Sequence, residues 1–166
     1  MAGDGKVYGI PRNAESVLII DPAAGTTDTS SMTVLAGTAK WRGGVLAGDG
    51  KVYGIPYNAE SVLIIDPAAG TTDTSSMTGL AGSGKWAGGV LAGDGKVYGI
   101  PRSAESVLII DPAAGTTDTS SMTGLAGSGK WYGGVLAGDG KVYGIPGNAE
   151  SVLIIDPAAG TTDTSS

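Results

Sequence analysis

The sequence predicts an all-β repeat protein made of four copies of one unit, and three observations support this. The motif GDGKVYGIP recurs every 45 residues, beginning at Gly3, Gly48, Gly93 and Gly138. The copies are nearly identical, since residues 48–92 and 93–137 differ at only three positions. No part of the unit has apolar residues at helical spacing over about ten positions. A period of this length is typical of supersecondary units that stack to bury a shared core.

The first half of the unit predicts a hairpin. Residues 41–47 form a glycine-rich strand of small side chains, and residues 48–50 (Gly-Asp-Gly) form a tight turn where positive φ is easily adopted. Residues 51–55 form a second strand whose side chains alternate between two faces, and Pro56 ends it.

The second half of the unit predicts two more strands. Residues 61–65 are apolar on both faces, as expected for a strand that lies between neighbouring sheets. Residues 66–70 (Asp-Pro-Ala-Ala-Gly) form a turn, in which proline presets φ and glycine supplies the left-handed exit. Residues 71–80 are β-branched and polar, which suits a solvent-facing edge strand.

Four antiparallel strands in roughly 40–50 residues, repeated along a chain, describe the blade of a β-propeller. We therefore predict an all-β β-propeller of four-stranded antiparallel blades, with about four repeats per chain. It is a single domain over residues 1–166, with repeats 3–47, 48–92, 93–137 and an incomplete 138–166. The glycine-rich strand should be innermost, because backbones crowd near the central axis. A solenoid is the structural alternative, although its repeats are usually shorter.

The stretch GGVLAGDGKVYGIPGNAESVLIIDPAAG resembles the blades of YVTN-type and NHL-type propellers. The shared features are a small-residue strand, a DGK hairpin, a VY strand and an apolar strand that ends in Ile-Asp before a glycine turn. The resemblance covers about two-thirds of each repeat and implies the propeller fold. Such propellers serve mainly as binding platforms and only sometimes as enzymes. The near identity of the repeats indicates either recent amplification or deliberate consensus construction.

The composition argues against most kinds of chemistry. The chain has no Cys and no His, which removes disulfides, thiolate metal ligands and the commonest general base. A net charge of −6 argues against nucleic acid as a partner, and no apolar run approaches the ~18 residues of a membrane span. We predict no enzyme activity, no cofactor and no metal site, with a carboxylate-dependent hydrolase or lyase as a distant alternative. The start of the chain has no signal-peptide core, and localisation stays unknown.

The chain stops 14 residues short of four full units. It holds three copies of the first strand, at Trp41, Trp86 and Trp131, and four copies of the second and third strands. In one interpretation, copies of the chain join into a larger ring, with an eight-bladed dimer as the simplest case. In the other, the chain is a piece of a longer parent. We prefer the first, so the expected partner is the chain itself and the expected function is a self-assembling scaffold.

Apart from the first residue of the chain, six positions of the unit vary, and all lie in or beside two loops at the same face of the meander. One loop joins the second strand to the third, and the other joins the fourth strand to the next blade. The alternative to the scaffold function is a binding module, in which this variable face contacts a glycan, an anionic small molecule or a protein. The alternative is that surface loops simply drift more freely than strands. The candidate residues are Arg12, Arg42, Tyr57, Arg102, Tyr132, Asn13, Asn58 and Asn148, with the neighbouring Lys40, Lys85 and Lys130.

Two aromatic columns are expected to pack between blades rather than to contact a ligand: Trp41, Trp86 and Trp131, and Tyr8, Tyr53, Tyr98 and Tyr143. The aspartates of the two turns, such as Asp49 and Asp66, gather on the opposite face. The sequence therefore predicts a polarised body whose variable face is less acidic than the other.

Overall fold

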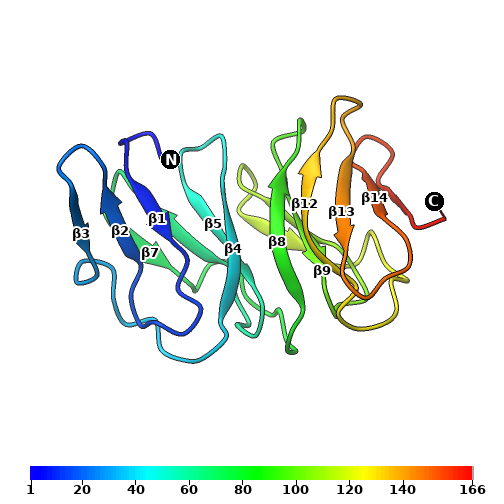
Figure 1. The fold of residues 1–166 in the computed structure, drawn as a ribbon, viewed down its shortest axis with the longest axis horizontal. Coiled ribbons are helices and arrows are strands. Elements are labelled where there is room, and N and C mark those ends of the chain that lie inside the picture. The colour runs from blue at the N-terminus through cyan, green and yellow to red at the C-terminus, as the bar shows by residue number, and fades with distance from the viewer. Residues whose placement is uncertain (166) are drawn as a thin grey trace.

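The computed structural model describes residues 1–165, and its fifteen strands form four antiparallel sheets in chain order, which we call blades 1 to 4 (Figure 1). Blade 1 has three strands: β1 (Val7–Gly9), β2 (Leu18–Asp21) and β3 (Thr26–Asp28). Blade 2 has β4 (Trp41–Leu46), β5 (Val52–Pro56), β6 (Leu63–Asp66) and β7 (Thr71–Asp73). Blade 3 has β8 (Trp86–Leu91), β9 (Val97–Pro101), β10 (Leu108–Asp111) and β11 (Thr116–Asp118). Blade 4 has β12 (Trp131–Leu136), β13 (Val142–Pro146), β14 (Leu153–Asp156) and β15 (Thr161–Asp163). Among the described residues there is no helix that could cross a membrane.

The glycine-rich strands β4, β8 and β12 lie next to one another, as predicted for the innermost position. Their backbones approach so closely that only glycine fits at the contact. A Cβ atom at Gly43 would lie 2.9 Å from the Cα of Gly88, and one at Gly88 would lie 2.9 Å from the Cα of Gly133. The small residues of this strand are therefore required by the packing of consecutive blades.

A bulge interrupts each inner strand at its start. Trp41 pairs with Pro56 and the next pair is Gly44 with Gly54, so two residues of β4 face one residue of β5. Gly43 within this bulge has a φ of +85°, which glycine adopts without strain. β8 and β12 carry the same bulge. Bulges redirect the side chains around them, so residue 42 and its equivalents leave the regular alternation of the strand.

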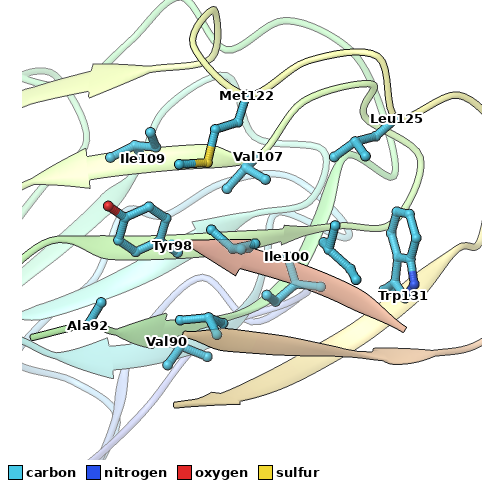
Figure 2. Packing of buried hydrophobic residues seen from close by; sticks show 12 residues of the cluster. Val90, Ala92, Tyr98, Ile100, Val107, Ile109, Met122, Leu125 and Trp131 are labelled. Carbon is cyan, nitrogen blue, oxygen red and sulfur yellow. The ribbon is translucent and has the colours of Figure 1, made fainter. Parts of the chain in front are cut away.

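The apolar core is divided into three layers, one at each junction between consecutive blades. At the junction of blades 2 and 3, Ile55 and Met77 of one blade pack with Val97 and Leu108 of the next. The same residues recur at the junction of blades 3 and 4, where Ile100 and Met122 pack with Val142 and Leu153. Figure 2 shows Met122 beside Val107 and Leu125 beside Trp131 in this cluster. Each junction is therefore a repeat of the same interface.

The predicted packing of the aromatic columns is confirmed in the interior blades. Trp41, Trp86 and Trp131 are buried, and the Trp41 indole Nε1 donates a hydrogen bond to the carbonyl oxygen of Ser61 at 2.8 Å. Tyr53 and Tyr98 are also buried, whereas Tyr8 and Tyr143 of the terminal blades are half-buried. Each tyrosine hydroxyl donates to the hairpin aspartate of its own blade, as Tyr53 does to Asp49 at 2.8 Å.

The fourth strand is shorter than predicted, because β7 ends at Asp73 rather than continuing to residue 80. The Asp73 carboxylate accepts hydrogen bonds from the Ser75 backbone N–H at 2.6 Å and from the hydroxyls of Ser75 and Ser76. These local bonds turn the chain out of the sheet ladder. Met77 and Leu80 then pack into the junction with blade 3. The correction applies equally to β3 and β11, which end at equivalent aspartates.

We predict that stability falls as the pH drops from about 4 to about 2, because these turns lose their acceptor. Hydrogen bonds from the serine hydroxyls and amides hold the pKa of Asp28, Asp73 and Asp118 at about 2, below the usual carboxyl value. A carboxylate with a lowered folded-state pKa stabilises the fold above its unfolded pKa, and this contribution disappears as the folded pKa is crossed. Urea unfolding at several pH values measures the loss. The triple Asp→Asn variant should show a shallower fall over this range, and an unchanged profile would contradict the assignment.

A second prediction concerns the contact between inner strands. Gly88→Ala should lower the free energy of unfolding by about 1–3 kcal/mol more than Gly133→Ala, because only the former crowds a neighbouring backbone. Both glycines have positive φ, +79° and +68°, so the backbone strain of alanine is similar. A Cβ at Gly133 meets no atom within 4 Å. Equal losses for the two variants in urea unfolding would contradict the close approach.

Candidate ligand-binding site

The five large variable residues gather at one end of the inner strands. Arg42 and Tyr132 lie on the bulges of β4 and β12. Tyr57 and Arg102 directly follow the prolines that end β5 and β9, and Arg12 holds the same position in blade 1. Because β4 runs antiparallel to β5, its start and the end of β5 lie at the same edge. The fold therefore brings both variable columns together.

These five residues form one cluster, which we call the arginine–tyrosine cluster. The guanidinium carbons of Arg12, Arg42 and Arg102 lie 6.0, 5.7 and 5.4 Å from the ring centroid of Tyr57. Those of Arg42 and Arg102 also lie 5.1 and 5.3 Å from the centroid of Tyr132. The Nε of Arg102 donates a hydrogen bond to the Tyr132 hydroxyl at 3.0 Å. Distances of this size are those of cation–π contacts.

Small residues in the same two columns make room for the large ones. Ala87 is buried on β8, between the strands that carry Arg42 and Tyr132, and its small side chain lets these two residues meet. At Gly147, a Cβ atom would lie 2.3 Å from a ring carbon of Tyr132. The variable side chains are thus matched to one another by packing. This matching is a feature that the comparison of repeats by itself did not reveal.

The arginines of the cluster have no carboxylate partner among residues 1–165. The four ion pairs in this part of the chain join Lys6–Asp21, Lys51–Asp66, Lys96–Asp111 and Lys141–Asp156, with nitrogen–oxygen distances of 3.3–3.7 Å. All four link the two turns at the opposite face, so lysines there offset the predicted excess of aspartates. On the variable face, Glu60 and Glu105 act on Lys85 and Lys130 through Coulombic attraction without forming an ion pair within 4.0 Å among residues 1–165. The cluster therefore concentrates three positive charges in a chain of net negative charge.

The three lysines predicted on the binding surface are buried, and this corrects their expected placement. Lys85 is only 4% exposed, and Lys40 and Lys130 are buried to a similar extent. The Lys85 Nζ donates to the carbonyl oxygens of Gly82, Ala59 and Tyr57 at 2.8, 2.9 and 3.2 Å. Burial lowers the pKa of its ammonium to about 8. These lysines hold two loops together and do not present their charge to solvent. A lysine precedes the tryptophan of each inner strand, although the residues around this pair vary. This constancy is the sequence signal for the structural role of the lysines.

The asparagines of the variable columns also bond to the chain. Asn13 Oδ1 accepts a hydrogen bond from the Ala39 N–H at 2.7 Å, and Asn58 Oδ1 accepts one from the Gly84 N–H at 2.8 Å. Each bond links a blade to the loop that leads into the next one. Asn148 in blade 4 is exposed. The structure therefore separates the candidates into an arginine–tyrosine cluster and a set of buried or bonded loop anchors.

Two other places in the molecule are weaker candidates for a functional site. A hollow recurs at each blade junction, lined at the second junction by Leu80, Lys85, Trp86 and Glu105. The amine of its lysine is already bonded to backbone carbonyls, and its tryptophan is a core residue. Within residues 1–165, no three acidic side chains come close enough to hold a metal ion. The arginine–tyrosine cluster is the stronger candidate.

The sequence matches no family model and no curated protein. The structure is similar to virginiamycin B lyase from Staphylococcus aureus, with a TM-score of 0.78 at 15% identity over 99% of this chain and 53% of that one. It is also similar to hydrazine synthase from Kuenenia stuttgartiensis, with a TM-score of 0.73 at 16% identity over 95% and 44% of the chains. An auxiliary nutrient binding protein from Bacteroides ovatus gives 0.66 at 14% identity over 98% and 40%.

These likenesses place the chain among β-propeller-like proteins, as the repeat predicted. The identities are low, so the likeness concerns the fold, which supports lyases, synthases and binding proteins alike. The chain spans about half the length of virginiamycin B lyase and a smaller share of the other two proteins.

We predict that Lys85→Met lowers the free energy of unfolding by about 2 kcal/mol or more, because it removes the three hydrogen bonds that the buried ammonium donates to carbonyl oxygens. Lys51→Met is a matched control, since Lys51 makes an exposed ion pair with Asp66 that contributes little. Urea unfolding of both variants measures the difference. If Lys85→Met cost no more than Lys51→Met, the anchoring role of the buried lysine would be wrong.

Proposed function

We propose that this protein is a non-enzymatic scaffold whose copies assemble head to tail into a ring, with two chains forming eight blades. The observation behind the proposal is that the two ends of the blade array expose opposite halves of the internal junction. Blade 1 (blue) and blade 4 (orange) lie at opposite ends of the molecule in Figure 1. The faces that these two blades turn outward are therefore not covered by one another.

The outward face of blade 1 matches the side of a junction that later blades bury. Val7 is 40% exposed, whereas its equivalent Val97 is fully buried. Leu18 is likewise exposed, whereas its equivalent Leu108 is buried against blade 2. The two residues lie on adjacent strands and belong to one apolar face.

The outward face of blade 4 matches the other side of the junction. Ile145 is 50% exposed, whereas its equivalents Ile55 and Ile100 are fully buried. Val135 is exposed as well, and its equivalent Val90 is buried. Since the repeats are nearly identical, β1 and β2 of a second copy offer this face the residues that β9 and β10 of blade 3 offer blade 2, without the inner strand that blade 1 lacks. Heterologous contacts of this kind close into rings when the rotation permits.

The comparisons support a ring of two chains. One copy superposes on about half of virginiamycin B lyase, so two copies have the length of such a protein. The near identity of the units, by recent amplification or by construction, favours assembly because every junction uses the same residues. The absence of histidine and cysteine from the sequence supports a function other than catalysis.

The second candidate function is a binding module, in which the variable face contacts a glycan, an anionic small molecule or a protein. The observation that favours it is the arginine–tyrosine cluster. Arginine and tyrosine are enriched where proteins bind partners, because they combine stacking surface with directed hydrogen bonds. The two candidates are compatible, because the cluster lies at one end of the inner strands and the proposed assembly uses the outward faces of blades 1 and 4.

We predict that the protein in solution has twice the 16.3 kDa mass of one chain, and that Ile145→Lys reduces it to one chain. Lysine at residue 145 would be buried without a partner at the new junction, which is unfavourable. Light scattering after gel filtration measures the mass. Val34→Lys is the matched control, because Val34 is exposed on a loop and away from both outward faces. A wild-type particle of one chain at high concentration would rule out the assembly.

Mixing two blocked variants tests the head-to-tail arrangement. Val7→Lys blocks the face of blade 1 and Ile145→Lys blocks that of blade 4, so each variant alone should remain a single chain. Their mixture retains one intact pair of faces and should form a complex of two chains. If Ile145→Lys alone still dimerised, like faces would be pairing and the head-to-tail arrangement would be wrong.

A further inference from the structure

We propose that the arginine–tyrosine cluster binds a multiply charged oxyanion, with phosphate and sulfate esters as the ligand class. The proposal extends the second candidate function and is independent of ring assembly. The arginines involved are Arg12, Arg42 and Arg102, and the aromatic residues are Tyr57 and Tyr132.

The first property of the cluster that favours an anion is its charge. Three guanidinium groups lie around one tyrosine ring, and no carboxylate of residues 1–165 lies within 4.0 Å of them. Like charges held this close repel one another, and an anion that binds between them removes the repulsion. The Glu60 carboxylate on the same face favours the charged form of Lys85 through Coulombic attraction, and it forms no ion pair with an arginine of the cluster. The cluster is therefore a positive site without an internal counterion.

The second property of the cluster that favours an anion is the geometry of its hydrogen-bond donors. The three arginines come from three different blades, at the ends of β1 and β9 and on the bulge of β4. They therefore reach the Tyr57 ring from different elements rather than along one strand. A planar carboxylate presents two oxygens to one fork, whereas a tetrahedral oxyanion directs its oxygens in several directions and can accept from several guanidinium groups. This arrangement favours phosphate or sulfate over a single carboxylate.

The third property of the cluster that favours an anion is its exposure to solvent. Arg12 and Arg42 are exposed, and Arg102, Tyr57 and Tyr132 are half-exposed, so a ligand from solvent can reach all five. The two rings add flat apolar surface beside the charges, onto which the organic part of an ester can stack. A site for a small charged ester follows.

Isothermal titration calorimetry of the whole chain with sodium pyrophosphate tests the proposal. We expect saturable binding that weakens as the NaCl concentration rises, because the contacts are electrostatic. Sodium acetate, a single carboxylate, should bind at least about tenfold more weakly, in keeping with fewer charge-assisted hydrogen bonds. Absence of pyrophosphate binding at low salt, with the fold intact by circular dichroism, overturns the proposal. Light scattering on the same sample reports assembly separately, so a failure here leaves the ring unaffected.

Arg42→Ala and Arg102→Gln test the site residues. Each should weaken pyrophosphate binding by about tenfold or more, which corresponds to the loss of one charge-assisted contact. Arg42→Ala introduces the residue that blade 3 already carries at Ala87, so the fold is expected to accept it. The charge-matched control is Lys96→Ala, because Lys96 pairs with Asp111 at the opposite face. If Lys96→Ala weakened binding as much as Arg42→Ala, the attraction would belong to the overall charge and the site would be wrong.

Discussion

The structure depends on the close approach of neighbouring inner strands. A Cβ atom at residue 43 or 88 would lie only 2.9 Å from a Cα atom of the next inner strand, so both positions require glycine. Glycine in turn permits the positive φ that forms the bulge at the start of each inner strand. The bulge then places Arg42, Ala87 and Tyr132 beside the loop residues that follow each second strand. The packing of the blades and the arginine–tyrosine cluster are thus consequences of one steric constraint.

Near identity of the repeats gives this constraint a second consequence. Each junction buries the same residues, so the stability of the array is the sum of equal blade–blade layers rather than of one central core. In an array of identical layers, the first and the last blade each lack a neighbour on one side. Their outward faces are opposite halves of the blade–blade junction. Val7 of blade 1 and Ile145 of blade 4 are accordingly exposed, whereas their equivalents Val97 and Ile55 are buried. The proposed assembly and the proposed binding use separate surfaces of one scaffold.

The sequence predicted the features that depend on periodicity and on turn chemistry. The number and order of strands, the inner position of the glycine-rich strand and the packing of Trp86 followed from the repeat. The early end of β7 did not, because the Asp73 carboxylate competes locally with the sheet ladder for the backbone. The burial of Lys85 was also missed, since a lysine before a tryptophan is ordinarily a surface cation. The convergence of Arg12, Arg42 and Arg102 on one ring required the bulge, which a list of variable positions does not contain.

The most direct test of this account is a crystal structure of the protein taken from its oligomeric fraction. The account predicts that Val7 and Leu18 of one copy are buried against Ile145 and Val135 of the next, in the arrangement of the internal junctions. A lattice in which both outward faces stay open to solvent, or in which like faces pair, would contradict it.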